Sequence, residues 1–291
     1  MSKLILMGTP AFVVPIFDDL RKQHEIIAVF TRKPKPTGRK MILTKTPVHL
    51  WAEEHNIPVH ANIKDFDTAP KPDYIIVAAY GVILRDNVLN AAPCINLHPS
   101  DLPKYRGASP IGTAIMNGDI ESAICIMGMV DDVDAGKVYM REKFKIGEND
   151  TTYDIEGFVS KRAGPMLNEY LANTEKYPPL PQTGTPTFTR KITSANLDID
   201  WTRMPREIHN QVRAIGGRTR INGLDCKIIQ TRVDDDKLVI DIIQPAGKKP
   251  MSWKDFFNGQ QGKCLIAPCP PKKAIGFDIC MDKDGKVQTN S

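Results

Sequence analysis

The sequence predicts an α/β protein with a doubly wound, mostly parallel sheet, followed by a smaller β-rich domain. Through the first 150 residues, short apolar runs alternate with stretches of helical spacing, which is typical of parallel strands covered on both faces. A Pro-rich stretch at 178–186 has the composition of a linker and cannot form a helix. Short strand-like runs separated by turn residues follow, at a spacing typical of a small barrel or sandwich.

The elements of the first part follow from the apolar runs and from helix-start residues. Pro10 suits the first turn of a helix whose apolar residues recur at helical spacing as far as Leu20. Thr46 is expected to cap the N-terminus of another helix, with Pro47 at its first position. The expected strands are 3–7, 25–30, 73–79, 94–97 and 123–129, and the expected helices are 10–20, 46–55, 110–117 and 150–175.

Two polar residues stand at the end of the fourth expected strand. Asn96 and His98 are two positions apart, so they point to the same side of the strand, and Pro99 stops it. An amide donor beside a titratable ring can stabilise an oxyanion and move protons. Sheets of this class bind ligands beyond the C-terminal ends of their strands, where both residues lie. Taken alone, the pair is explained more simply as a polar strand end with a surface histidine.

A second polar cluster follows the fifth expected strand. Asp131, Asp132 and Asp134 lie in a loop that ends at Gly136, and such acid-rich loops are common turns. One of the three carboxylates could fix the tautomer of His98 or relay a proton. Spacing alone does not choose among them.

A longer motif connects the two clusters. The pattern Asn-x-His-Pro-Ser-x-Leu-Pro-x-Tyr-Arg-Gly at 96–107, with Asp-x-Gly 36 positions after the histidine, resembles the formyltransferases that use 10-formyltetrahydrofolate. The loop at 32–45 carries six basic residues and no acidic one, which makes it a candidate to grip RNA. This basic loop and the C-terminal matches resemble the branch of this family that acts on methionyl-tRNA. Further matches extend the resemblance over most of residues 3–260, and they fall at 7–10, 36–40, 44–47, 80–84, 191–192, 199–201, 244–249 and 251.

The resemblance implies a fold, a co-substrate and a partner. It implies a Rossmann-like formyltransferase fold with a C-terminal OB-like β-barrel, a kind of domain that often binds nucleic acid. The implied catalytic residues are Asn96, His98 and Asp134, the co-substrate is 10-formyltetrahydrofolate, and the partner is initiator methionyl-tRNA. The expected folate contacts are Tyr80, Gly81, Val82, Ile83, Leu84, Ser100, Leu102, Pro103 and Asp131. The expected tRNA contacts are Lys35, Arg39, Lys40, Arg218, Arg220, Lys248 and Lys249.

The chain departs from the family pattern at two places. Asp101 stands where a leucine is usual, which adds a charge beside the expected site. The turn after Ile215 is replaced by Gly-Gly-Arg-Thr-Arg at 216–220, and its two arginines could bind phosphate. Arg106 is expected to shape the loop beside the site or to position a substrate.

The domain division follows the linker and the charge. We expect a catalytic domain at 1–182, a linker at 183–203 and a tRNA-binding barrel at 204–291. The barrel is expected to begin with a helix at 205–214, followed by strands at 226–230, 237–243, 263–266 and 274–279. From residue 183 onward there are 18 basic and 12 acidic residues, against 21 and 22 in the rest of the chain. A basic C-terminal third suits a module that meets a polyanion.

Composition limits the remaining classes. Hydrophobic residues make up 41% of the chain, no apolar run is long enough to span a membrane, and the N-terminus is unlike a secretion signal. The six cysteines lack metal-ligand spacing, so we expect reduced thiols and no metal. The turn at 8–10 lacks the second and third glycines of a dinucleotide-binding loop. A cytoplasmic monomer is the expectation.

Three alternatives stay open on the sequence. The first is a formyltransferase of the same superfamily that acts on a small amine, and the second is a hydrolase that releases formate from the folate. The third is a non-catalytic RNA-binding protein on the same scaffold. The basic second domain disfavours the first alternative, and the intact Asn96, His98 and Asp134 disfavour the third.

Overall fold

The computed structural model describes residues 1–38, 40–260, 265–267 and 279–289, and it divides the chain into two compact units. The first unit comprises residues 1–110, 121–145 and 154–190, and the second comprises 111–120, 146–153 and 191–291. The expected linker at 183–203 is divided between the two units, because residues 183–190 belong to the first unit and residues 191–203 to the second.

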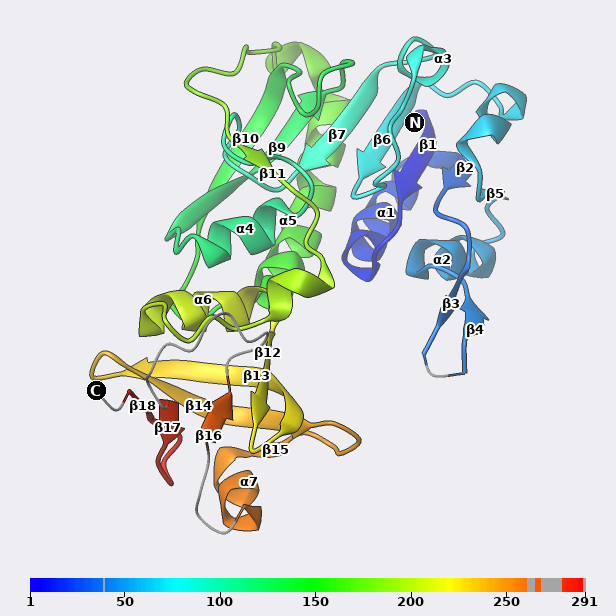
Figure 1. The fold of residues 1–291 in the computed structure, drawn as a ribbon. Helices are drawn as coiled ribbons and strands as arrows, with labels where there is room; N and C mark the ends of the chain where they lie inside the picture. Colours follow the sequence, from blue (N-terminus) through cyan, green and yellow to red (C-terminus); the bar gives the residue numbers. More distant parts are fainter. Residues whose placement is uncertain (39, 261–264, 268–278, 290–291) are drawn as a thin grey trace. The chain divides into compact units, whose positions relative to one another are not determined.

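The first unit is built on a seven-stranded sheet of order β10-β9-β7-β6-β1-β2-β5 (Figure 1). Neighbours from β7 to β5 run parallel, whereas β9 is antiparallel to β7 and β10 is antiparallel to β9. The predicted α/β class with a mostly parallel sheet is confirmed. The strands are β1 (Lys3–Gly8), β2 (Glu25–Phe30), β5 (Val59–His60), β6 (Tyr74–Ala78), β7 (Cys94–His98), β9 (Glu121–Gly128) and β10 (Val138–Lys145).

Strand β10 was not expected from the sequence, and its position explains why. It is the edge strand, and polar side chains such as Arg141 and Lys143 interrupt its apolar residues. The central strands β1, β6 and β7 are buried along almost their whole length, which is why their continuous apolar runs were recognisable.

The helices of this unit begin close to the expected positions. Thr46 caps α2 as expected, since its hydroxyl accepts a 3.1 Å hydrogen bond from the backbone N–H of His49. The helix expected from Pro10 begins as a 3-10 turn and becomes α-helical at Val14. The α-helices are α1 (Val14–Arg21), α2 (Pro47–Glu54), α3 (Asp86–Leu89) and α5 (Thr152–Ala172), and the 3-10 turns are Ala11–Val13, Ile63–Thr68 and Thr174–Lys176.

Two small two-stranded pairings complete the first unit. The basic loop that follows β2 forms an antiparallel hairpin of β3 (Lys35–Thr37) and β4 (Ile42–Thr44). Strand β8 (Arg106–Gly107), directly after the central motif, pairs in parallel with β11 (Phe188–Thr189) of the expected linker. The linker segment thus adds a strand beside the motif.

The second unit has an antiparallel sheet of order β15-β14-β13-β12-β16-β17-β18. An isolated antiparallel bridge also joins Val239 of β14 to Lys286, just before β18. Of the expected strands 263–266 and 274–279, residues 263–264 and 274–278 lie outside the described residues. The strands are β12 (Gly217–Ile221), β13 (Leu224–Asp234), β14 (Lys237–Pro245), β15 (Met251–Ser252), β16 (Leu265–Ala267), β17 (Ile279–Met281) and β18 (Val287–Thr289).

Helix α6 (Pro205–Ile215), predicted at 205–214, packs its apolar face onto this sheet. Ile208 and Val212 join a buried core that also contains Trp201, Ile228 and Ile240. The other helices of this unit are α4 (Pro110–Met116), whose first residue belongs to the first unit, the 3-10 turn Ser194–Leu197 and α7 (Trp253–Gly259).

The segment expected as a turn at 216–220 is mostly strand β12. Its burial alternates, so that Gly217, Thr219 and Ile221 face inward while Arg218 and Arg220 face outward. Gly217 is required by packing, because a Cβ there would lie 2.4 Å from the Cδ1 atom of Ile199. Within the described ranges, no helix combines the length and apolarity that a membrane span needs.

His209 in α6 provides a test of this core. Its side chain is buried, with Nδ1 3.0 Å from the Thr231 hydroxyl and Nε2 3.3 Å from the Glu148 carbonyl. Burial lowers the pKa of His209 below its usual value near 6.5, so the unfolded chain takes up the proton first as pH falls.

We therefore predict that stability from this group is fully present above about pH 6.5 and is lost as pH falls below it. The free energy of unfolding, measured by urea titration at pH 7 and pH 5, should fall less in His209→Gln than in the wild type. Since burial also lowers the pKa of His24, the parallel variant His24→Gln separates the two contributions. Identical pH slopes for His209→Gln and wild type would contradict the prediction.

Candidate functional site

The site begins at the C-terminal end of β7, between its neighbours β6 and β9. Asn96 is in register with Val77 of β6 and with Met127 of β9. Asn96 and His98 are 8% and 4% exposed, so both polar residues are buried at the C-terminal end of this central strand. A buried amide or imidazole needs hydrogen-bond partners, which the surrounding loops supply.

Asp134 is the carboxylate that meets these two side chains. Its Oδ1 accepts a 3.0 Å hydrogen bond from Asn96 Nδ2, and its Oδ2 lies 3.5 Å from His98 Nδ1. Oδ2 also accepts a 2.7 Å hydrogen bond from the backbone N–H of Gly107. Asp131 and Asp132, which spacing alone left as alternatives to Asp134, are exposed. The structure thus brings together the three residues expected to be catalytic.

The second ring nitrogen of His98 has its own partner, which fixes the tautomer. Nε2 lies 2.9 Å from the backbone oxygen of Tyr105, and a carbonyl can only accept, so Nε2 carries a hydrogen. In the neutral ring the lone pair is then on Nδ1, the atom that faces Asp134. A proton taken up at Nδ1 would lie beside the carboxylate, which suits a group that accepts and returns a proton.

The loop between β7 and β8 is held by its own hydrogen bonds and by β10. The Ser100 hydroxyl donates to the Lys104 carbonyl at 2.6 Å, and the Leu102–Pro103 peptide is cis. Arg141 of β10 donates to the Leu102 carbonyl at 2.6 Å and forms a 2.8 Å ion pair with Asp101. The charge of Asp101 is therefore paired on the sheet side. Ser100 and Leu102 are fully buried, backbone included, so neither residue presents an atom to solvent.

In the loop expected to contact folate, residues 80–84, only the middle residues are exposed to solvent. The side chains of Tyr80 and Leu84 are buried in the core, and burial raises the pKa of Tyr80 to about 12, whereas Val82 and Ile83 are exposed. The Tyr80 carbonyl accepts from Thr9 at 3.1 Å and from Arg32 Nε at 3.2 Å.

Arg32 also donates from Nη2 to the Gly81 carbonyl. Arg32 opens the basic segment 32–45, which the sequence suggested as a grip for RNA. Its guanidinium instead holds the neighbouring loop.

Gln182 is a site residue that sequence reasoning missed. Its Nε2 donates to the carbonyls of Asp134 and Gly136, each at 2.8 Å. Its Oε1 accepts from Arg106 Nε at 3.0 Å and from Nη2 at 2.7 Å. The only sequence signal was a single polar side chain within a Pro-rich stretch, which is too weak to assign a role.

The residues expected to bind tRNA are not part of this cluster. Lys35 and Lys40 are exposed on the β3–β4 hairpin, and Arg39 lies outside the described residues. In the second unit, Arg218 pairs with Asp198 and Arg220 pairs with Asp225, at 2.6 and 3.1 Å. The other two expected contacts, Lys248 and Lys249, are exposed after β14.

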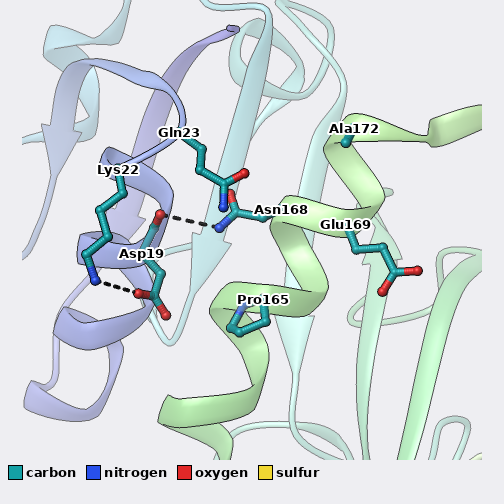
Figure 2. A pocket seen from close by; sticks show the side chains of 7 residues that line it. All are labelled: Asp19, Lys22, Gln23, Pro165, Asn168, Glu169 and Ala172. Carbon is teal, nitrogen blue, oxygen red and sulfur yellow. Dashed lines mark hydrogen bonds and ion pairs between the residues drawn. The ribbon is translucent and has the colours of Figure 1, made fainter.

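A separate hollow of about 380 Å³ lies between α1 and α5 (Figure 2). In it, Lys22 pairs with Asp19 at 2.8 Å, and Asn168 Nδ2 donates to the Asp19 carbonyl at 3.3 Å. None of its lining residues belongs to the cluster around Asp134. Among the described residues, no group of His, Cys, Asp or Glu side chains is arranged to hold a metal ion.

Comparison with known proteins assigns the class. Residues 2–171 match the formyl transferase family. A methionyl-tRNA formyltransferase of Rickettsia bellii is 32% identical over 293 residues, with 88% of this chain and 96% of the relative covered. The chain belongs to the formyl transferase family.

Solved structures share the fold at low sequence identity. One is a methionyl-tRNA formyltransferase from Clostridium thermocellum, with a TM-score of 0.60, 14% identity and coverage of 84% of this chain and 99% of that one. Another is an N-formyltransferase from Helicobacter canadensis in complex with folinic acid and dTDP-3-aminofucose. Its TM-score is 0.63, its identity is 19%, and each chain is covered completely.

The loop that carries Asp134 generates a prediction about Gly136. A Cβ on Gly136 would lie 1.8 Å from the Gly128 carbonyl oxygen, so Gly136→Ala must displace the loop. We expect a loss of roughly 1–3 kcal/mol in the free energy of unfolding, typical of overpacking, measured by urea titration. Gly157→Ala is the matched control, since its Cβ would meet nothing within 4 Å and alanine is favoured inside a helix. Equal stability of Gly136→Ala and wild type would contradict the tight approach.

Proposed function

We propose that this protein is an enzyme that transfers the formyl group of 10-formyltetrahydrofolate to the α-amine of methionyl-tRNA. The observation that carries the proposal is the convergence of Asn96, His98 and Asp134 in a chain that belongs to the formyl transferase family. The nearly full-length match to a relative named methionyl-tRNA formyltransferase supports the tRNA substrate. Initiator methionyl-tRNA is the proposed acceptor, used for translation initiation.

The geometry suits addition to a formyl carbon. The amine attacks, an N–C bond forms, and a tetrahedral intermediate with an oxyanion results. Asn96 uses one N–H on Asp134, so its second N–H can donate to the oxyanion. His98 can take the proton of the amine at Nδ1, beside Asp134, and return it to the folate nitrogen. As that nitrogen is protonated, the oxyanion re-forms the carbonyl and the bond from the carbon to the folate nitrogen breaks. This route needs no covalent enzyme intermediate and no metal.

The folate contacts are proposed for the loops around this site. Val82 and Ile83 offer exposed apolar side chains, and Gly81 offers backbone. Tyr80, Leu84, Ser100 and Leu102 are buried and would act by shaping the loops around the folate. Pro103 and Asp131 complete the proposed set.

The tRNA contacts are proposed for two basic regions. In the first unit these are Lys35, Arg39 and Lys40 of the hairpin segment. In the second unit they are Arg218, Arg220, Lys248 and Lys249. Residues 204–291, which form most of the second unit, are proposed to be an OB-like barrel that follows a catalytic domain at 1–182 and a linker at 183–203. Their antiparallel sheet and the Val239–Lys286 bridge support a closed barrel.

In the experiment, purified protein is incubated with 10-formyltetrahydrofolate and either initiator or elongator methionyl-tRNA. The formyl-methionine produced is then measured. We expect formylation of the initiator tRNA, and a roughly 10²–10³-fold lower kcat for Asn96→Ala, since an oxyanion donor is lost. Asn90→Ala, at an exposed asparagine after α3, is the control and should keep the wild-type rate. Folate turnover without tRNA would favour a hydrolase, and transfer only to small amines such as amino sugars would favour the other branch.

A second prediction concerns Arg32, which holds the folate-side loop through the carbonyls of Tyr80 and Gly81. Arg32→Gln should raise the KM for 10-formyltetrahydrofolate roughly ten-fold, since hydrogen bonds to a charged group contribute about 1.5–3 kcal/mol. The KM for tRNA should change little. Lys33→Gln removes an adjacent exposed charge and serves as the control. If Arg32→Gln and Lys33→Gln raised only the KM for tRNA, Arg32 would belong to the RNA-binding surface instead.

A further inference from the structure

We infer that Gln182 is a positioning residue for the formyl transfer reaction, acting through Asp134. The inference rests on the proposed function, and it concerns a residue in a stretch that looks like a plain linker. Gln182 is 48 positions from Asp134 and 76 from Arg106 along the chain, yet its amide joins the two segments.

The hydrogen-bonding capacity of this amide is fully used. A primary amide has two N–H donors and two acceptor positions on oxygen. Both N–H groups go to carbonyls, those of Asp134 and Gly136, and both acceptor positions go to the guanidinium of Arg106. The amide cannot be turned round, because a carbonyl cannot donate and a guanidinium cannot accept. Its orientation is fixed by the network.

The backbone around Gln182 is anchored to the start of β10, just after the Asp134 loop, and to the loop that carries Tyr105. Leu180 and Val138 exchange two backbone hydrogen bonds of 2.8 and 2.9 Å. Five residues after Gln182, Thr187 accepts two hydrogen bonds. Its hydroxyl accepts from the backbone N–H of Tyr105 at 2.9 Å, and its carbonyl accepts from the backbone N–H of Arg106 at 2.8 Å. The segment therefore spans from the start of β10 to the loop that carries Tyr105, and Gln182 lies between these anchors.

Both segments that Gln182 joins bear on the carboxylate of Asp134. Arg106 precedes Gly107, whose N–H donates to Asp134 Oδ2 at 2.7 Å. The backbone of Asp134 has a left-handed conformation, φ 48°, which is uncommon for non-glycine residues although aspartate adopts it more readily than most. Gln182 bonds the carbonyl of that same residue. Without this bond, the carboxylate loses its fixed position against Asn96 and His98.

The test is a double-mutant cycle in the formylation assay with full-length protein. Gln182→Met keeps the size of the side chain and removes all four hydrogen bonds. We expect kcat to fall roughly 10–100-fold while the KM values for folate and tRNA stay within about three-fold, because an interaction with the reacting centre is lost rather than substrate binding. In an Asp134→Asn background, Gln182→Met should reduce kcat little further, since residues that act as a unit are not additive.

Gln211→Met is the matched control. Gln211 also donates its amide to backbone carbonyls, those of Asn196, Leu197 and Asp198, but within the second unit. It should lower the melting temperature without the loss of kcat. Should Gln182→Met not fold, Arg106→Met breaks the other side of the same link and should show the same non-additivity with Asp134→Asn.

Three results would overturn the inference. They are an unchanged kcat in Gln182→Met, a change in KM alone, and equal fold-losses in the wild-type and Asp134→Asn backgrounds. Failure of the wild-type protein to formylate methionyl-tRNA would instead count against the proposed function, so the two failures are distinguishable.

Discussion

The carboxylate of Asp134 is the point on which the arrangement of the site depends. Its two oxygens contact three groups from two parts of the chain: the amide of Asn96 and the imidazole of His98 on β7, and the backbone N–H of Gly107 on β8. A carboxylate can accept several hydrogen bonds at once, and charge-assisted bonds of this kind are short and strong. One side chain thus fixes the end of a buried strand against two loops.

Several residues of this site have backbone conformations that are unfavourable in isolation. Asp134, Tyr105 and Ser109 all have left-handed φ angles, near 48°, 61° and 61°. Each such residue costs of order 1–3 kcal/mol and persists only where its surroundings offset that cost. For Asp134 the constraint is the hydrogen bond that its carbonyl accepts from Gln182, and for Tyr105 it is the bond that its backbone N–H donates to the Thr187 hydroxyl. The rigid sheet therefore positions Asn96 and His98, and a hydrogen-bonded set of loops positions their partner.

The basic residues divide into two groups with different physical roles. Arg32 and Arg141 hold loop carbonyls near the site, and their charges are used within the fold. Lys35 and Lys40, by contrast, are exposed on a hairpin. Exposed lysines suit contacts with phosphates, because a hydrated ammonium on a flexible stem can follow a polyanion without fixed geometry. A count of positive charge along the sequence does not distinguish these groups.

Local sequence patterns were sufficient for the order of the central strands and helices and for the first half of the site. Continuous apolar runs predict buried parallel strands, and two-residue spacing puts Asn96 and His98 on one side whatever surrounds them. The edge strand β10 and strand β12 were not predicted, because their polar residues interrupt the apolar pattern that marks a buried strand.

The sequence by itself determined the α/β alternation, the amide–imidazole pair and the family to which its motif belongs. The motif implied Asp134, and the tertiary structure showed that its carboxylate meets that pair. Only the tertiary structure decided that Arg32 donates to the Gly81 carbonyl and that Gln182 bonds both Asp134 and Arg106. These contacts join residues 36 to 76 positions apart, and their partners depend on how the loops pack. Periodicity encodes the conformation and burial of each element, whereas hydrogen bonds between loops arise only once the sheet has brought the loops together.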